Sequence, residues 1–219
     1  MEEKEFPKPE VELKKPTFSF FHWFFIIPKL ILGICLLPFV YSFSVSFLNQ
    51  LRLIEVELQN FFWAGLISFL IIYLFVYEPL IIYQKGQKLC QILFRFFAPL
   101  VKVAPYLLPV YFIILFLGYL FYALIFKSNL YAIKYFIFLF SFSLGLHLIF
   151  TAKVLRAKKD FLRINYLFGF SFIYILNIIL FVLCLDLITP EVSFVNFFQQ
   201  AYKDGIDFLY AIFKQLFLR

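Results

Sequence analysis

The side chain best suited to chemistry in this sequence is His147, which lies inside a long apolar stretch. Ser143 and Thr151 stand four residues to either side, so in a helix all three share one face. A polar group inside an apolar span is a candidate for function, because a central charge in lipid costs about 2.5–3.5 kcal/mol. The alternative is a neutral imidazole whose hydrogen bonds are satisfied by these hydroxyls or by a neighbouring helix.

Two further polar residues could join this patch. Asn177 falls within another apolar stretch, where hydrogen bonding between helices is its expected role. Asp160 follows the stretch that contains His147. We therefore predict a polar pocket of His147, Ser143, Thr151, Asp160 and Asn177. The three cysteines do not have the spacing of a disulfide pair or a zinc motif. The spacing of the cysteine, histidine and acidic residues does not predict a metal site, and no other cofactor is predicted.

The elements that position these residues are predicted from composition. Of 219 residues, 64% are hydrophobic and 15% are charged, and the mean hydropathy is +0.93. A soluble domain of this size has no core large enough for so much apolar surface, so we predict an integral membrane protein. The apolar runs are continuous rather than alternating, which predicts an all-α, polytopic membrane helix bundle. The 36 phenylalanines are expected mainly on its lipid-facing surface.

We predict five transmembrane helices, at residues 26–48, 61–77, 105–126, 131–155 and 164–188. A shorter, more polar helix is expected at 80–97, and an amphipathic helix at 193–218 is expected to lie in the membrane interface. The predicted organisation is a flexible tail at 1–17, a transmembrane helical domain at 18–190 and the interfacial helix region at 191–219. Small residues at Ser42 and Ser46, and at Ser141 and Gly145, have the spacing of close helix packing.

Lysines and arginines crowd two segments, 85–102 and 153–163. Both segments fall on one side of the membrane in a five-span alternation, and the positive-inside rule assigns that side to the cytoplasm. We therefore predict a cytoplasmic N-terminus and a C-terminal helix on the outer side. The net charge of +7 is assigned to these segments and to anionic lipid, so no nucleic-acid partner is predicted.

Three segments together resemble a known family. They are LIIYQKGQKLCQILF at 80–94, APYLLPVY at 104–111, and LGLHLIFTAKVLRAKKD at 144–160, followed by the run at 165–185. In order and spacing they resemble the bacterial site-2 protease-like integral-membrane zinc metallopeptidases, over roughly residues 26–215. The resemblance implies a multi-pass protein of the bacterial inner membrane.

The sequence departs from that family at its catalytic motif. Where the resemblance implies HExxH after Gly86, the chain reads Gln87-Lys88-Leu89-Cys90-Gln91. In the intact motif two histidines bind zinc and the glutamate activates the metal-bound water. Amides at Gln87 and Gln91 bind zinc poorly, and a cation at Lys88 repels Zn²⁺ and cannot serve as a base while charged. Gln87, Lys88, Cys90 and Gln91 are therefore degenerate motif positions.

A second departure is the short segment between Gln91 and Ala104, which leaves no room for the strand-like segment that the resemblance implies for aligning a peptide. We predict a catalytically inactive pseudoprotease that acts as a binding or structural subunit. Its predicted partners are the lipid bilayer and a helix of another membrane protein. The alternatives are a small transporter or lipid-handling protein, and an active hydrolase with unusual ligands.

Overall fold

The computed structural model describes residues 20–76, 79–126, 129–157 and 162–217, and these residues contain helices and no strand. The predicted tail at 1–17 lies outside them. The helices are α1 (Phe20–Leu51), α2 (Val56–Ile71), the π-helical turn η1 (Ile72–Val76), α3 (Leu80–Leu93), α4 (Ala98–Leu107), α5 (Val110–Phe126), α6 (Leu130–Ala157), α7 (Leu162–Ile188) and α8 (Phe194–Phe217). The prediction of an all-α bundle is confirmed.

Four helical segments are long and apolar enough to cross a membrane: Ile27–Leu51, Val56–Val76, Leu130–Ala157 and Tyr166–Ile188. They correspond to four of the five predicted spans. The fifth, α5, has 17 residues and is about 25 Å long, at the short end of what a bilayer requires. The molecule is therefore a multi-pass helical membrane protein with four candidate spans, and a membrane crossing by α5 stays a prediction.

The segment around the shortened helix differs from the prediction. The expected helix at 80–97 ends at Leu93, and the expected span at 105–126 is divided into α4 and α5. Proline explains where α4 begins and where it ends. A proline in the first turn of α4 favours a helix start at that point, and Pro109 disfavours helical backbone at the residue before it.

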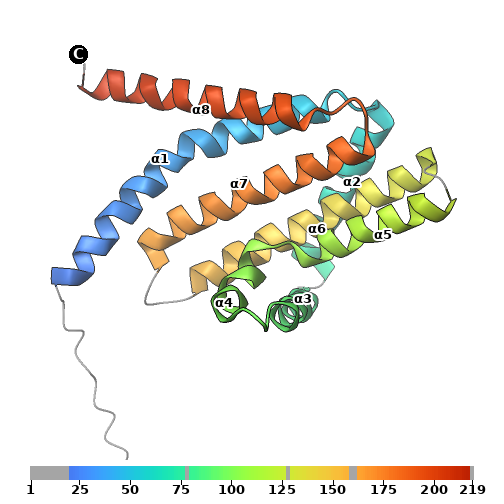
Figure 1. Ribbon diagram of the computed structural model, residues 1–219, viewed down its shortest axis with the longest axis horizontal. Helices are drawn as coiled ribbons and strands as arrows, with labels where there is room; N and C mark the ends of the chain where they lie inside the picture. The colour runs from blue at the N-terminus through green and yellow to red at the C-terminus, as the bar shows by residue number, and fades with distance from the viewer. Residues whose placement is uncertain (1–19, 77–78, 127–128, 158–161, 218–219) are drawn as a thin grey trace, which may run out of the picture.

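Figure 1 shows α1, α7 and α6 side by side, with α5 beside α6. Helix α2 packs on α6, and α1 packs on both α7 and α8. The short helices α3 and α4 pack on each other and lie across the half of α6 that ends at Ala157 (Figure 1). The polar residues of α6 and α7 therefore meet the two short helices at one end of the bundle.

Phenylalanine forms much of the centre of the bundle as well as its surface. Phe181 of α7 contacts the rings of Phe47, Phe62 and Phe112, with centroids 5.3–5.6 Å apart. Two of these contacts are edge-to-face, a geometry that stabilises a ring pair by about 0.5–1.5 kcal/mol beyond area burial. The expectation that phenylalanine lies mainly against lipid is thus incomplete, since these rings join four different helices.

Small residues allow the closest helix approaches. A Cβ added at Gly65 of α2 would collide with the Phe138 carbonyl and the Ser141 hydroxyl of α6. A Cβ added at Gly205 of α8 would lie 2.9 Å from Ser42 Oγ of α1. Ser141 and Ser42 therefore lie at helix contacts, as their spacing in the sequence predicts.

Helix α8 turns back from the end of α7 and runs beside α1 (Figure 1). The turn is held by two side chains: Gln50 Oε1 accepts from Ser193 N at 3.1 Å, and Asp186 Oδ1 accepts from Phe194 N at 3.3 Å. Phe197 and Ala201 of α8 are buried. The predicted amphipathic helix is present; its location in the headgroup layer stays a prediction.

Candidate functional site

The site is built around the break between α4 and α5. Leu108 has extended backbone, with φ −100° and ψ 127°, and Pro109 behind it is fully buried. Because Pro109 has no N–H group, it cannot bond to the carbonyl of Pro105 four residues earlier. The last carbonyls of any helix lack partners within that helix. Because the bilayer core supplies no bulk water, these groups need partners inside the protein.

Side chains from two spanning helices meet this requirement. Asn177 Nδ2 of α7 donates to the Leu107 carbonyl at 3.3 Å and to the Ile173 carbonyl of its own helix at 2.8 Å. The imidazole of His147, on α6, hydrogen-bonds the backbone of Tyr106. Since His147 Nε2 has no partner among the described residues, the bonded atom is Nδ1, which donates to the Tyr106 carbonyl. Two consecutive carbonyls at the end of α4 are thus capped from outside.

A second hydrogen-bonded group joins α3 to α6. The hydroxyl oxygens of Tyr83 and Thr151 lie 2.9 Å apart, and Gln87 Nε2 donates to Tyr83 Oη at 2.9 Å. Burial raises the pKa of Tyr83 to about 12, so the phenol keeps its proton at neutral pH. The chain Gln87–Tyr83–Thr151 leads from the half-exposed surface of α3 into the buried face of α6.

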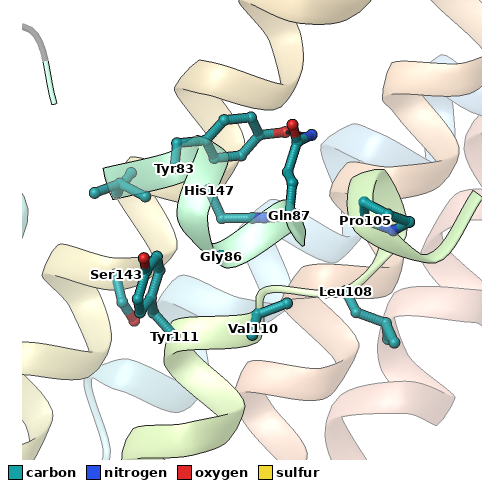
Figure 2. Close-up of a pocket in the computed structure, with 10 residues that line it drawn as sticks. Tyr83, Gly86, Gln87, Pro105, Leu108, Val110, Tyr111, Ser143 and His147 are labelled. Carbon is teal, nitrogen blue, oxygen red and sulfur yellow. Dashed lines mark hydrogen bonds between the residues drawn. The ribbon is translucent and has the colours of Figure 1, made fainter. Parts of the chain in front are cut away.

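Between these two groups lies a cavity of about 10 Å³. It is lined by residues of α3, the α4–α5 break and α6, shown in Figure 2: Tyr83, Gly86, Gln87, Pro105, Leu108, Val110, Tyr111, Ser143, Leu146 and His147. Tyr111 forms one wall and donates from Oη to the Ile82 carbonyl at 2.6 Å. A Cβ at Gly86 would lie 2.7 Å from Tyr111 Cε2, so glycine is what allows this ring to pack across α3.

The predicted polar pocket is brought together in part. His147 and Ser143 line the cavity, and Thr151 and Asn177 bond to groups beside it. The hydroxyls of Ser143 and Thr151 do not satisfy the imidazole: Ser143 Oγ donates to the Phe140 carbonyl, and Thr151 bonds to Tyr83. The neighbouring helix α4 supplies a partner for one of the two ring nitrogens, so the alternative of a fully satisfied imidazole holds only in part. Asp160 lies outside the described residues.

The degenerate motif positions separate from one another. Gln87 lines the cavity, and Cys90 is buried one turn further along α3. Lys88 and Gln91 are exposed, so Gln91 does not join Gln87 in the site. Within the described ranges, no three His, Cys, Asp or Glu side chains gather as metal ligands would. The arrangement can hold a small neutral group by hydrogen bonds.

Sequence reasoning missed Lys134, which is 6% exposed near the start of α6. Its Nζ lies 2.6 Å from Glu57 Oε1 of α2 and 5.1 Å from the centroid of the Tyr131 ring. A lysine inside an otherwise apolar span, with a carboxylate near the start of an adjacent span, is the signal that could have indicated this ion pair.

Comparison with protein-family models, with curated proteins and with solved structures finds no match for this chain. The resemblance to site-2 protease-like metallopeptidases stays a prediction.

Proposed function

We propose that this chain is a catalytically inactive, multi-pass membrane protein that acts as a binding or structural subunit, with α8 as the helix that contacts its partner. The observation that carries the proposal is the polar stripe of α8. Its members recur every three, four or seven residues, which places them on one face of the helix, and all are exposed: Asn196, Gln200, Lys203, Asp207 and Lys214.

The stripe points away from the rest of the molecule. Phe197, Ala201 and Gly205, on another side of α8, are buried against the bundle. The stripe therefore extends along a helix that packs on α1, a spanning helix, and its members are exposed among the described residues. At the boundary of the predicted interfacial layer, acyl chains cannot satisfy Lys203 and Asp207, because charged groups in hydrocarbon cost several kcal/mol. A partner helix with its own polar stripe would satisfy them by hydrogen bonds and ion pairs.

Three features support the inactive part of the proposal. Lys88 stands where the resemblance implies a general base, and its side chain is exposed. Gln91, in place of a second zinc ligand, is exposed as well. His147 uses one ring nitrogen to cap the end of α4. The positions that the resemblance assigns to catalysis thus carry the wrong chemistry, and the buried histidine has a structural role.

A second candidate function is lipid handling, and one observation favours it. A groove of about 240 Å³ runs between the first half of α1 and the last half of α8. Its lining is entirely apolar: Ile31, Ile34, Cys35, Pro38, Leu209, Ile212, Phe213, Leu216 and Phe217. Such a groove fits an acyl chain.

We also propose a bacterial inner-membrane location with the N-terminus in the cytoplasm. The hydrogen bond between Tyr83 and Thr151 places α3 beside the end of α6. The exposed basic residues Lys85, Lys88 and Arg156 therefore gather at one end of the bundle. Under the positive-inside rule that end faces the cytoplasm, and reporter fusions at either terminus test the orientation.

The test of the subunit proposal is gentle detergent purification from native membranes, with co-purifying proteins, lipids and zinc quantified on one sample. Two variants sharpen it. The first combines Lys203→Asp with Asp207→Lys, which keeps net charge and composition but inverts the stripe. The matched control combines Lys88→Gln with Gln91→Lys, which exchanges two exposed residues of α3.

We expect a stoichiometric membrane protein that is lost from the α8 double variant and retained by the α3 double variant. Loss from the α3 variant alone would place the contact on α3 and refute the role of α8. About one zinc per chain would contradict the inactive part of the proposal. A stoichiometric lipid without a protein partner would favour lipid handling.

A further inference from the structure

The described helices supply no hydrogen-bond partner for one ring nitrogen of His147, Nε2. The residue is 5% exposed, and its Nε2 has no partner among the described residues. Because Nδ1 carries the proton that is donated to the Tyr106 carbonyl, Nε2 of the neutral ring is a lone-pair acceptor. A buried acceptor without a donor costs about 1–3 kcal/mol, so this atom requires a ligand that supplies a hydrogen.

The ring is directed into the cavity beside the α4–α5 break. Figure 2 shows His147 extending from α6 toward Gln87 on α3, with Ser143 and Tyr111 on another side. The cavity volume of about 10 Å³ is close to the space that one water molecule needs. A peptide, a sugar or a lipid headgroup is therefore too large for this site.

The walls offer a water molecule the two to four partners that it needs. Val110 and Tyr111 begin α5, and the first N–H groups of a helix have no acceptor within that helix. Gln87 donates one N–H to Tyr83 and keeps its amide oxygen. Ser143 donates to the Phe140 carbonyl and keeps its oxygen lone pairs. Donors and acceptors are thus both available around His147 Nε2.

The uncharged lining of the cavity favours a neutral ligand. None of the ten lining residues is a carboxylate, a lysine or an arginine. A buried cation would have no counter-charge there, and an anion would face the lone pair of His147 Nε2. A small molecule that both donates and accepts hydrogen bonds meets both conditions.

We propose that this cavity is a binding site for one water molecule, which donates to His147 Nε2 and bridges α3, α6 and the start of α5. The bound water completes the hydrogen bonding of the helix break that Asn177 and His147 Nδ1 begin. It also makes His147 a hydrated imidazole inside an apolar bundle. This site is independent of the α8 contact and goes beyond the proposed subunit function.

The experiment is solid-state NMR on the full chain in lipid vesicles, with ¹⁵N-labelled histidine. The sequence contains two histidines, so the spectrum has two imidazoles, and a His147→Gln variant identifies the signals of His147. We expect a protonated Nδ1, an unprotonated Nε2 that accepts a hydrogen bond, and magnetisation transfer from water to this ring. A protonated Nε2, or a ring without water contact, would overturn the proposal.

Two serine-to-valine substitutions locate the water. Ser143→Val adds carbon atoms to the cavity wall and removes the hydroxyl that faces the water, whereas the matched control Ser68→Val makes the same change on α2, outside the cavity lining. We expect the transfer from water to His147 to be lost in the Ser143→Val variant and kept in the Ser68→Val variant. Transfer that persists in a folded Ser143→Val variant would place the water elsewhere and overturn the proposal. If the Ser143→Val variant does not fold, the presence or absence of water contact in the wild-type spectrum decides.

Discussion

His147 of α6 and Asn177 of α7 cap consecutive carbonyls at the end of α4: the imidazole bonds to Tyr106, and the amide bonds to Leu107 at 3.3 Å. The two residues are thirty positions apart and on different helices, yet they serve one break in the backbone. Without them, the break at Pro109 would leave these carbonyls unsatisfied inside the bundle. The polar residues of the two spans thereby fix where the short helices lie.

The cap by Asn177 can be tested with a substitution of similar volume. Asn177→Leu removes the donor to the Leu107 carbonyl, and we expect a loss of about 0.6–2 kcal/mol, the range found for hydrogen bonds between membrane helices. The measurement is the unfolding midpoint of the protein in mild detergent. Asn196→Leu, at an exposed position of α8, is the control and should unfold at the wild-type temperature. An Asn177→Leu protein as stable as the wild type would contradict the cap.

The hydroxyl of Thr151 should stabilise the contact of α3 with α6. Thr151→Val keeps the side-chain shape but leaves the Tyr83 phenol with Gln87 as its remaining partner. We expect a loss of about 0.5–1.5 kcal/mol in unfolding free energy. In a double-mutant cycle, Thr151→Val should add little to a chain that already carries Tyr83→Phe, since the bond between the two hydroxyls is then already lost. Fully additive losses would mean that the two hydroxyls do not interact.

The ion pair of Lys134 and Glu57 should respond differently to removal of each partner. Glu57→Gln leaves a lysine that is 6% exposed without its counter-charge, and Lys134→Met leaves only a half-exposed carboxylate. We expect Glu57→Gln to lower the unfolding free energy by about 1–3 kcal/mol more than Lys134→Met does. This difference is smaller than the cost of breaking a fully buried pair, because Glu57 reaches water. The unfolding free energies of both variants and of the double variant give the comparison. Equal losses would show that burial of Lys134 is unimportant.

The thiol of Cys90 should be slow to alkylate. Burial raises the pKa of Cys90, so the group keeps its proton to a higher pH than a free cysteine does. Since the thiolate is the reactive form, alkylation should begin only at a pH above that of an exposed thiol. Iodoacetamide labelling against pH, in a chain carrying Cys35→Ser and Cys184→Ser, measures this. The same chain unfolded in strong detergent is the control. Identical profiles for the folded and unfolded chains would contradict burial of the group.

Long helices were the most predictable part of the fold. The span predicted at 131–155 appears as α6 (Leu130–Ala157), because a continuous apolar run with few charges determines a membrane helix almost by itself. The break at Pro109 was not predictable in the same way. Proline is tolerated inside membrane helices, and the apolar run continues across it. Its effect depends on whether other helices satisfy the freed carbonyls, which is a tertiary property.

The contacts of the candidate site were likewise only partly predictable from the sequence. The spacing of Ser143, His147 and Thr151 correctly places all three on one side of α6, yet the partner of His147 lies on α4, forty-one positions earlier in the chain. Asn177 was expected to bond between helices, and its bond to Leu107 confirms this. The sequence could not identify which backbone group it would meet, because hydropathy and helical period carry no information about which helices are neighbours.

Close packing of α2 against α6 gives the sharpest stability prediction. A Cβ at Gly65 would collide with the Phe138 carbonyl and the Ser141 hydroxyl, and backbone cannot move aside as a flexible side chain can. We expect Gly65→Ala to separate the two helices and to lower the unfolding midpoint strongly, by more than the ~1 kcal/mol that alanine gains over glycine in a helix. Gly118→Ala in α5 is the matched control, because nothing lies within 4 Å of its added Cβ. It should be neutral or slightly stabilising. If both alanine variants unfold alike, the close approach of α2 to α6 at Gly65 is refuted, and with it the alignment that brings Glu57 to Lys134.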